Sequence, residues 1–531
     1  MVEEAPVLIA GGGLIGLTTA MFLAQRGIRS VAVERLAEPS RLPRAAFFHM
    51  RTFELFRQAG IEDQVRRQSE AEFTPDGAIV GLESLAGRKL ADFIPSLNEG
   101  VEALSPCRRW FVSQPGLEPI LRRRAEEVGA TVVNGKEVTG FDQDRDGVTV
   151  QLRDVSSGAE SQMRCRYLIS CEGAHSRIRD QLGIRMEGRG VFSNSITIYF
   201  RADLAPFLVG RNLSIIYVNN EVLGGFFRLE KTSQRGFLVV NYVGDPYADP
   251  ETAANAAADI SEARLVELVQ AGAGAPVKVE IEGCSRWRAV SDVASAYQSG
   301  RVFLAGDCAH LMPPNGGFGG NTGIHDAHNL AWKLAMVLEG TAGPGLLDSY
   351  EAERRPVGRF TVDQAYARYV TRTAAYLQAR DAPPYMDDFQ IELGYLYDSG
   401  AVLAEPGSPR LHEPPAQSHG RPGSRAPHLW LQRDGGRVST LDLMGDGFAL
   451  LVGPDGSGWL AAAEAARGRF KGLSLAAHRI EAPEFPSAYG LQPTGASLVR
   501  PDGFVAWRAP ALPADPSGEL CAALGKVLAL N

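Results

Sequence analysis

Residues 6 to 34 contain the sequence feature that most constrains the fold of this chain. A short apolar run predicts a buried strand, and a glycine-rich turn, an apolar helical stretch and a second strand follow it. In order, these segments are Val7 to Ala10, Gly11 to Gly16, Leu17 to Gln25 and Ser30 to Val33. Strand, glycine turn, helix and strand in this order predict a βαβ unit that binds a dinucleotide.

Three glycines in the turn have the spacing GxGxxG. Gly11 suits a tight turn, Gly13 lets a pyrophosphate approach the backbone, and Gly16 lets the helix pack closely on the strand. The helix N-terminus offers free amide groups and the positive end of a dipole. Glu34 ends the second strand, at the distance expected for a carboxylate that binds the adenosine ribose. The alternative is a tight turn in an unrelated α/β domain, which would not need the flanking elements or the carboxylate.

A second glycine-rich segment follows a predicted buried strand at Val302 to Ala305. Gly306 ends that strand, and Asp307 stands at its carboxyl end. The loop from Pro313 to Gly323 begins with two prolines and contains five glycines, and a helical pattern of apolar residues starts at Ile324. Prolines stiffen such a loop, while glycines let the backbone approach a large flat ligand. We therefore expect a flavin at this loop.

The central part of the chain changes to short alternating strands that are rich in aromatic residues, which predicts a mostly antiparallel sheet. The expected strands are Ser195 to Phe200, Leu213 to Val218, Gly225 to Leu229 and Phe237 to Val243. Helices are expected at Ser261 to Gln270, Leu346 to Arg355 and Val357 to Ala379, whereas residues 75 to 112 are expected to be irregular.

The last part of the chain predicts a small α/β unit. A stretch rich in proline, glycine and polar residues, Glu405 to Pro427, reads as a linker or an extended wrap. Beyond it, strands are expected at Ser439 to Leu443, Phe448 to Val452 and Phe504 to Trp507, and an alanine-rich helix at Trp459 to Arg467. The unit has no CxxC motif, so we expect a structural or oligomerisation role rather than thiol redox chemistry.

Composition and charge exclude several classes of partner. The formal net charge of -8 gives no basic stripe for nucleic acid. No apolar run approaches a bilayer span, and the acidic start lacks a signal-peptide layout. The six cysteines show no metal-like clustering with histidine, so we expect no metal site and interpret them as buried thiols in a reducing cytoplasm.

Three motifs at strand ends together resemble those of the class A flavoprotein monooxygenases, the para-hydroxybenzoate and phenol hydroxylase type. They are GxGxxG from Gly11, an acid–glycine pair at Glu172 and Gly173, and the pair Gly306 and Asp307. In the tail, Leu441 to Phe448 and Gly495 to Arg508 resemble the C-terminal domain of longer members, the bacterial aromatic polyketide hydroxylases of the aklavinone 11-hydroxylase type.

This resemblance implies an α/β fold with a Rossmann-like FAD-binding domain, a mostly antiparallel β-sheet substrate domain and a C-terminal thioredoxin-like domain. The expected FAD-binding domain is discontinuous, at residues 1–180 and 285–400, with part of 75–112 lining the substrate side. The substrate domain is expected at 181–284 and the thioredoxin-like domain, without CxxC, at 401–531.

The resemblance also implies which residues bind FAD, and NADPH or NADH as a transient reductant. The FAD-binding residues implied are Gly11, Gly13, Leu14, Ile15, Gly16, Glu34, Arg35, Arg44, Gln114, Gly306, Asp307, Pro314, Gly317, Gly319, Gly320 and Asn321. Of these, Gln114 is expected near the ribityl chain and Asp307 on the ribityl hydroxyls. One departure is Glu172, where the family usually has aspartate; it leaves the handling of NAD(P)H open.

The first functional hypothesis is an FAD-dependent, NAD(P)H-consuming monooxygenase of antibiotic biosynthesis. It would hydroxylate a polycyclic aromatic polyketide with O2, through a flavin C4a-hydroperoxide. The candidate catalytic residues are Arg372, which as a fixed cation could stabilise a substrate phenolate, and His49, which lies in a segment expected to pass the flavin. The alternatives are a helix-surface arginine and a packed histidine. The enzyme is expected in the cytoplasm as a monomer or homodimer, without nucleic acid or membrane partners.

Two other hypotheses stay open. The same flavin fold could open a ring by Baeyer–Villiger oxygen insertion, or rearrange the polyketide oxidatively. A protein of another class, an FAD-binding stabiliser of a reactive intermediate without turnover, would also have these motifs. The Glu172 substitution is the feature that leaves this third hypothesis open.

Overall fold

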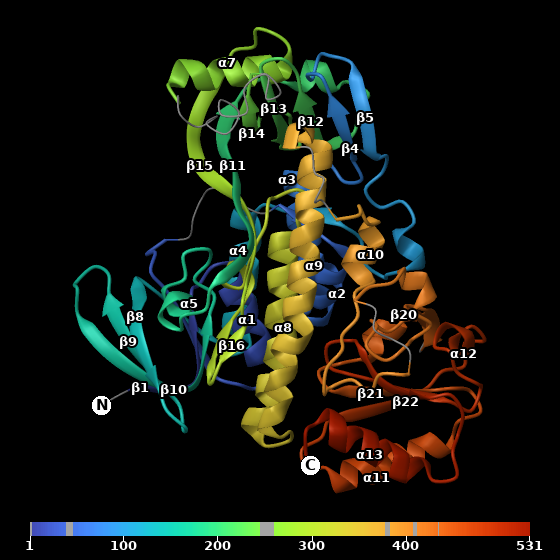
Figure 1. Ribbon diagram of the computed structural model, residues 1–531. Coiled ribbons are helices and arrows are strands. Elements are labelled where there is room, and N and C mark those ends of the chain that lie inside the picture. Colours follow the sequence, from blue (N-terminus) through green and yellow to red (C-terminus); the bar gives the residue numbers. More distant parts are fainter. Residues whose placement is uncertain are drawn as a thin grey trace.

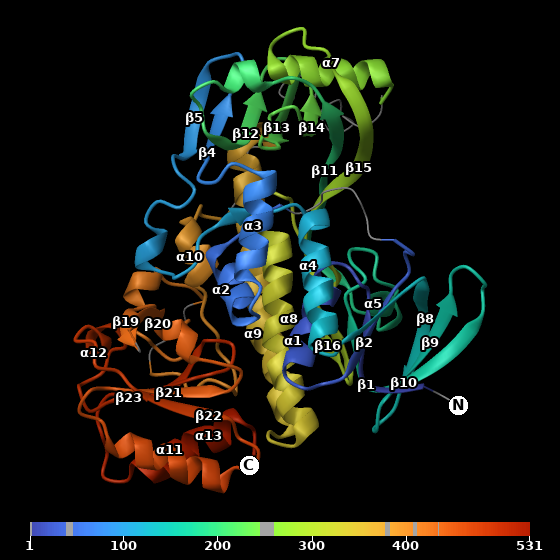
Figure 2. The same ribbon diagram turned by 180° about the vertical axis from the view of Figure 1, so that it is seen from behind.

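The computed structural model describes residues 3–38, 46–244, 260–377, 383–406, 411–433 and 435–530. Three sheets lie in three parts of the molecule, and two long helices, α8 (Phe318–Glu339) and α9 (Asp348–Arg372), run through its middle (Figure 1). Figure 2 shows α2 (Met50–Gln58), α3 (Glu62–Glu72) and α4 (Gln114–Glu127) on the opposite side of these two helices.

The first sheet is mostly parallel and contains the N-terminal βαβ unit. Its strand order is β16 (Gln298–Ser299), β17 (Val302–Leu304), β10 (Glu160–Ser170), β1 (Glu3–Ala10), β2 (Ser30–Glu34) and β7 (Thr131–Asn134). Strands β8 (Lys136–Gln143) and β9 (Val148–Asp154) extend from β10 as an antiparallel pair. Strands β1, β10 and β17 run parallel, so their carboxyl ends, with the three motifs, lie at one edge. Helix α1 (Leu14–Gln25) connects β1 to β2 and packs against α4 and α8.

The second sheet stands above the first and is antiparallel except for one pair. Its order is β18 (His310–Leu311), β15 (Glu280–Ala294), β11 (Met186–Arg201), β14 (Arg235–Val243), β13 (Leu223–Leu229), β12 (Leu213–Asn219), β4 (Ala78–Leu82) and β5 (Lys89–Ile94). Helix α7 (Glu262–Ala273) covers the face remote from α8, and Leu265 and Leu268 belong to the apolar core there (Figure 1). The opposite face of the sheet is turned toward the glycine-rich loop, Pro313 to Gly323, and is predominantly aromatic.

The C-terminal sheet has the order β22 (Leu475–Arg479), β21 (Phe448–Val452), β23 (Ala496–Val499) and β24 (Val505–Ala509). Helices α11 (Gly458–Arg469) and α13 (Pro516–Val527) pack together beside this sheet. A hairpin of β19 (Trp430–Arg433) and β20 (Gly436–Ser439), the short helix α12 (Phe485–Ala488) and the helix α10 (Asp388–Leu393) complete this side.

Three further short elements lie outside these larger sheets. Strand β3 (Phe47–Phe48) pairs with β6 (Trp110–Phe111), and α5 (Arg177–Gln181) follows the acid–glycine motif.

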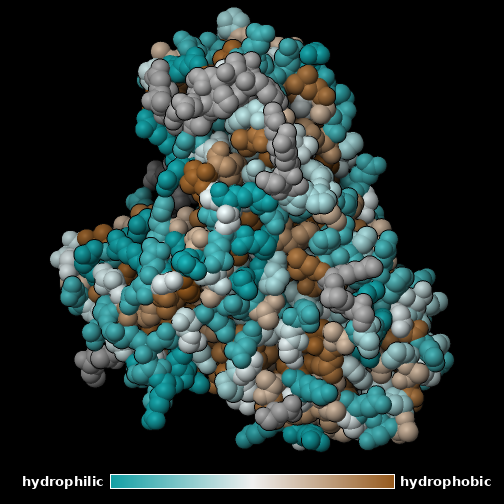
Figure 3. Space-filling view, viewed as in Figure 1, coloured by the Kyte–Doolittle hydropathy of each residue, from teal (hydrophilic) through white to brown (hydrophobic). Residues whose placement is uncertain are grey.

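On the face seen in Figure 3 hydrophilic side chains predominate and apolar ones form small scattered groups. Within the described ranges, no helix has the length and apolarity needed to cross a membrane.

Most of the expected strands and helices are confirmed, and four expectations are wrong. Residues 75–112 are not irregular, because β4 and β5 form the edge of the second sheet. Helix α8 begins at Phe318, before the expected Ile324, because its first turn is built largely of glycines that give no apolar pattern. The two helices expected around Pro356 are one helix, α9, and most of the expected strand 439–443 is a 3₁₀ turn at Thr440–Leu443.

Candidate functional site

The glycine turn after β1 is tightly packed at two positions and open at a third. A Cβ on Gly11, whose φ is 108°, would lie 2.3 Å from the Cys171 carbonyl oxygen, and one on Gly16 would lie 1.9 Å from the Gly11 oxygen. A Cβ on Gly13 would meet nothing nearer than the Glu118 carboxylate, at 3.7 Å. Gly13 is also the N-cap of α1 and adds no side-chain cap. The open amides of α1 at Gly13 therefore fit a diphosphate.

Glu34 holds the turn from the neighbouring strand. Its carboxylate accepts hydrogen bonds from the backbone amides of Gly12, at 2.8 Å, and Leu36, at 2.9 Å. Each carboxylate oxygen has a second lone pair, so Glu34 can also accept from ribose hydroxyls. Arg35 is exposed, and Arg44 lies outside the described residues. The FAD contacts expected of both arginines stay predictions.

Gln114 and the apolar residues of the turn border the same opening. Gln114, at the start of α4, donates a hydrogen bond to the Glu118 carboxylate at 2.6 Å, which places it near Gly13. Leu14 is buried, and Ile15 packs against Gly306 and Gly323. Ile15 thus connects the first glycine turn to the turn that presents Asp307.

The turn at Gly306 and Asp307 is fixed from below by a buried carboxylate. Gly306 has a φ of 67°, which favours glycine, and its amide donates to the Asp326 carboxylate of α8 at 3.1 Å. His310 Nε2 bonds the same carboxylate at 2.7 Å, and Arg354 of α9 donates to it at 2.8 Å. Burial opposes ionisation of Asp326, but Arg354 and His310 outweigh burial and lower its pKa. Asp307 itself is exposed and lines a cavity.

The glycine-rich loop carries the N-terminus of α8 to the edge of this cavity. Gly316 and Gly317 have φ values of 90° and 71°, and Gly317 caps α8 without a side chain. Pro314 is exposed, while Gly319 and Gly320 lie half-buried in the first turn. The free amides of this turn can face the electron-rich edge of a flavin and stabilise negative charge there.

Asn321 connects this loop to the segment at Phe47 to Thr52. Its side chain donates to the carbonyl oxygens of Phe47 and Gly317, and its oxygen accepts from the His49 amide and the Thr52 hydroxyl. The Asn321 side chain therefore positions the loop through bonds within the protein.

His49 is buried beside the same loop. Its Nε2 lies 2.9 Å from the Gly316 carbonyl oxygen, which can only accept, so Nε2 carries the proton. Burial lowers the pKa of His49, and the ring packs against Phe47 and Phe318. The sequence-based alternative of a packed histidine fits these contacts.

Glu172 turns inward rather than toward the cavity. Its carboxylate accepts from the Ser176 hydroxyl at 2.8 Å, the Ser170 hydroxyl at 3.2 Å and the Ile178 amide at 3.1 Å. Arg179 donates to the carbonyl oxygens of Ala174 and Cys308, which ties the motif to the turn at Asp307. The Glu172 carboxylate thus binds a free amide in the first turn of α5, beside the N-cap residue Ser176.

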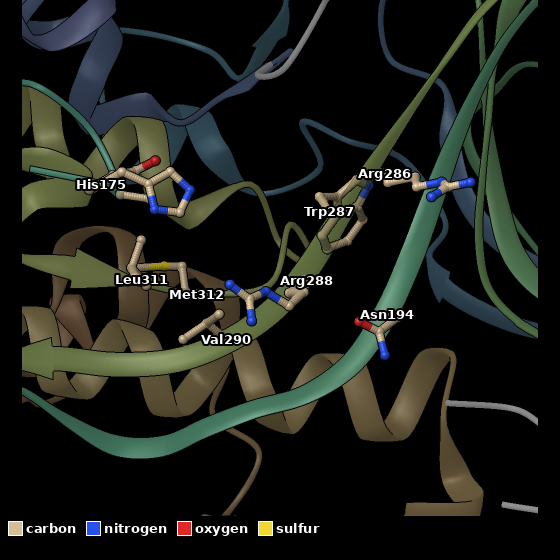
Figure 4. Close-up of a pocket in the computed structure, with 10 residues that line it drawn as sticks. His175, Asn194, Arg286, Trp287, Arg288, Val290, Leu311 and Met312 are labelled. Atoms are coloured by element: carbon tan, nitrogen blue, oxygen red, sulfur yellow. The ribbon is translucent and has the colours of Figure 1, made fainter. Parts of the chain in front are cut away.

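A cavity of about 850 Å³ lies beside Asp307, and its residues come from the acid–glycine loop, β11, β15 and the loop after Asp307. In Figure 4, Arg288 extends from β15 toward Met312, and His175 lies across from it. The lining residues are Ala174, His175, Asn194, Arg286, Trp287, Arg288, Val290, Asp307, Leu311 and Met312. Those on β15 were missed in the sequence, although the alternation in Ile281 to Val290 is a strand signal.

An aromatic cluster adjoins this cavity on the sheet face. Its core contains Phe47, Phe73, Phe111, Tyr217 and Phe226, with Phe93, Phe237 and Trp287 packed against it. Asn315 of the glycine-rich loop donates to the Tyr217 hydroxyl at 3.4 Å. Because Trp287 also lines the cavity, the cavity reaches from Asp307 to the aromatic cluster.

Arg372 lies at one end of the aromatic cluster, near the C-terminus of α9. It is only 6% exposed, so the helix-surface alternative is wrong. Its guanidinium donates to the Tyr385 hydroxyl at 2.5 Å and lies over the rings of Phe93 and Tyr217. Asp388 is 3.9 Å away, but Asp388 also pairs with Arg368, and Arg372 Nε has no partner among the described residues.

Comparisons with known proteins match the whole chain. Residues 4–365 match a family described as FAD binding domain, and residues 419–529 match one described as aromatic-ring hydroxylase, C-terminal. A 4-methyl-5-nitrocatechol 5-monooxygenase from Burkholderia sp is 49% identical, over 99% of this chain and 98% of the relative. Aklavinone 12-hydroxylase from Streptomyces purpurascens is 38% identical over 99% of both chains.

The fold also matches a solved structure over its full length. A ternary complex of aklavinone-11 hydroxylase with FAD and aklavinone superposes with a TM-score of 0.92, at 37% identity, and covers 100% of both chains. The sheets and helices of the present chain therefore have the same overall arrangement as in that protein.

Proposed function

The chain belongs to the family of FAD-dependent aromatic-ring hydroxylases, and from this premise we propose that it hydroxylates a phenolic ring of a polycyclic aromatic polyketide. It is an FAD-dependent oxidoreductase, and FAD, once reduced by NAD(P)H, supplies the activation of O2. The single observation that carries the proposal is the cavity that joins Asp307 to the aromatic cluster.

The residues of this chain have separable roles in such a reaction. Gly13 and the α1 amides would hold the diphosphate, Glu34 the ribose, and Asp307 the ribityl hydroxyls. The N-terminus of α8 would face the flavin ring, with Pro314, Gly317, Gly319 and Gly320 at its border. These assignments are supported by the open space at Gly13 and by the exposed Asp307 at the cavity.

The substrate ring would lie against the aromatic cluster, out of water. Arg372 would then hold the phenolate form of the substrate, because its guanidinium is buried and its Nε is unpaired within the described residues. A phenolate is more nucleophilic than a phenol, and its negative charge is stabilised by a fixed cation in a dry site. His49 would act by positioning the loop at Gly316 rather than by touching the substrate.

A second substrate, a single-ring nitrocatechol, is favoured by the relative from Burkholderia, whose identity to this chain exceeds that of the polyketide hydroxylases. The aromatic cluster, filled by several large rings, also suits a small flat substrate. Cytoplasmic location, O2 as co-substrate and a monomeric or homodimeric state are part of the proposal.

The test is an assay of the FAD-loaded enzyme under air with aklavinone and with 4-methyl-5-nitrocatechol. Oxidation of NADPH or NADH that depends on substrate, and a product heavier by one oxygen with every ring intact, would support hydroxylation. A ring-opened or rearranged product would favour the Baeyer–Villiger or rearrangement hypothesis. Tight FAD binding, with no stimulation of NADPH or NADH oxidation by either compound, would favour the non-catalytic stabiliser.

A further inference from the structure

Arg228 is a buried cation on the substrate-facing side of the second sheet. It lies on β13, two residues after Phe226, so both side chains point to the same face, about 7 Å apart along the strand. Phe226 pairs in register with Tyr217 of β12. Arg372 lies over the Tyr217 ring, at 6.0 Å from its centroid, so the pair Phe226 and Tyr217 stands between two arginines.

The environment of Arg228 leaves most of its donors unused. Its side chain is 4% exposed, and Nη1 donates to the Ser214 carbonyl oxygen at 2.8 Å. Nε and Nη2 are buried and have no hydrogen-bond partner among the described residues. Its guanidinium carbon lies 3.8 Å from the ring centre of Phe73 and 4.0 Å from that of Phe111. Two ring faces and one carbonyl replace the water that a guanidinium normally binds.

The nearest carboxylate does not neutralise Arg228. Glu72 accepts from the Ser113 amide at 2.6 Å, from the Ser113 hydroxyl at 3.0 Å and from Gln68 at 2.7 Å. Burial lowers the pKa of Arg228 to about 9, with Glu72 acting in the opposite direction. Among the described residues, no ion pair therefore offsets the free energy that it costs to bury this cation.

Arg26, a half-buried residue at the end of α1, also has buried Nε and Nη2 atoms without a partner among the described residues. The fully buried arginines in the described ranges differ from Arg228 in this respect. Each has a carboxylate within 4.0 Å; they are Arg51, Arg109, Arg179, Arg354, Arg368, Arg372, Arg425 and Arg500. A buried charge without an ion pair among the described residues is a common sign of a functional site. The missing anion is thus expected to come from outside the chain.

The contacts of Phe111 connect Arg228 to the flavin loop. Phe111 stacks on Phe47 with ring centres 4.7 Å apart and planes 17° apart. Phe47 contacts Gly317, where an added Cβ would lie 3.0 Å from the Phe47 ring, and its carbonyl oxygen accepts from Asn321. Arg228 therefore lies on the face of the second sheet that is turned toward the glycine-rich loop, and not on the face that α7 covers.

We propose that Arg228 binds an anionic substituent of the aromatic substrate, on the side of the ring opposite Arg372. This inference rests on the proposed function, because it places the substrate ring against Phe226 and Tyr217. The ligand class is an aromatic ring with an ionised hydroxyl at one side and a second acidic group, such as a carboxylate, at the other. Nε and Nη2 of Arg228 present two adjacent donors for the two oxygens of such a group.

The experiment compares two probes that differ in one charge, 3,4-dihydroxybenzoate and 3,4-dihydroxybenzamide. Their dissociation constants are measured from the change in flavin absorbance of the FAD-loaded enzyme, without NAD(P)H. The wild-type enzyme should bind the benzoate at least about tenfold more tightly than the benzamide, as one charge-assisted hydrogen-bonded contact implies. Arg228→Met should reduce that ratio to about one and leave benzamide binding within about twofold.

Two further variants make the result specific. Arg228→Lys keeps the charge and should retain part of the preference, whereas Arg235→Met, at the exposed start of the neighbouring strand β14, should retain all of it. If Arg228→Met does not hold FAD, Arg228→Gln gives the same comparison. Equal affinities in the wild type, no measurable binding of either probe, or an unchanged ratio in the neutral variants would overturn the proposal. Hydroxylation is assayed separately, so preference without turnover would overturn the proposed function and leave the assignment of Arg228 standing.

Discussion

The carboxylate of Asp326, inside α8, accepts a hydrogen bond from the backbone amide of Gly306 at 3.1 Å, directly behind the turn that presents Asp307. The same helix supplies, at its N-terminus, the amides that border the flavin loop. One helix therefore sets the positions of both the turn at Gly306 and Asp307 and the glycine-rich loop.

We predict that Asp326→Asn weakens FAD binding and stability together. Asparagine can still accept from Gly306, but it leaves the buried Arg354 without a countercharge, which costs about 3–5 kcal/mol. FAD titration and thermal unfolding of the apoprotein should both report the loss. Asp63→Asn, at an exposed ion pair of α3, is the control and should change neither. Unaltered FAD affinity in Asp326→Asn would show that the turn is held by other contacts.

We predict opposite outcomes for two neighbouring glycines. Gly13→Ala should fold normally, because the new methyl group meets no atom closer than 3.7 Å, yet should weaken FAD binding by tenfold or more, about 1.4 kcal/mol, by blocking the diphosphate. Gly16→Ala should destabilise the protein by about 1–3 kcal/mol, because its methyl group would overlap the Gly11 carbonyl. Denaturant unfolding of the apoproteins and FAD titration separate the two effects.

Asp307→Ala should purify largely without FAD, because it removes the carboxylate expected to bind the ribityl hydroxyls at the end of β17. Asp307→Asn should retain part of the cofactor, since the amide oxygen still accepts a hydrogen bond. Flavin absorbance relative to protein absorbance measures both. Full flavin content in Asp307→Ala would mean that the ribityl chain is bound elsewhere.

Arg372→Met should lower kcat on the order of 10²-fold, if the guanidinium stabilises the phenolate. Its effect should shrink as pH rises, because the free substrate then ionises without help. Arg372→Lys should recover part of the rate. Arg355→Met, on an exposed side of the same helix, is the matched control. An effect on folding alone, with kcat per bound FAD unchanged, would contradict the assignment.

Stability should depend on pH through Glu54, which joins α2 to the C-terminal unit. Burial opposes its ionisation, but Arg425 and Arg51 outweigh burial and lower the pKa of Glu54 to about 2, from an ordinary 4.5. Because the folded-state pKa is the lower one, the contribution is complete above pH 4.5 and is lost as pH falls toward 2. It amounts to roughly 3 kcal/mol.

The comparison of Glu54→Gln with the wild type isolates this contribution from that of other carboxylates. Denaturant unfolding between pH 6 and pH 3 should show a large loss of stability in the variant at pH 6, and a smaller gap as the pH falls. Glu464→Gln, at an exposed ion pair of α11, should follow the wild type throughout. A gap that stays constant with pH would indicate that Glu54 is not ionised in the folded state.

The expectations that held are those carried by local patterns. Val7 to Ala10 and Val302 to Leu304 are buried parallel strands with no polar face, and the glycines after them have few conformational alternatives. The aromatic strands of the second sheet were predicted in place but not in extent, because β11 and β13 run beyond the expected ranges. Helix α8 was only partly predicted, because Gly319, Gly320 and Gly323 have low intrinsic helix propensity. Gly323 packs closely against Ile15 and Gly306.

The expectations that failed concern long-range partners. Arg372 carries no sequence signal that separates it from Arg355 on the same helix, yet one is buried over aromatic rings and the other is exposed. Strand β4 pairs with β12, well over a hundred residues later, and β5 joins the edge of the sheet only through β4. The sequence does not distinguish Arg228 from other arginines in strands. Only the structure shows that its Nε and Nη2 have no hydrogen-bond partner among the described residues.

The sequence by itself determined the order of the three strand-end motifs, the fold class that they imply and the cofactor, because glycine geometry and strand burial are local constraints. Only the tertiary structure decided which charges are buried together, that Glu172 binds an amide in the first turn of α5 and that Arg228 stands unpaired. The reason is physical: the cost of a buried charge depends on the groups that surround it, and those groups come from segments far apart in the chain.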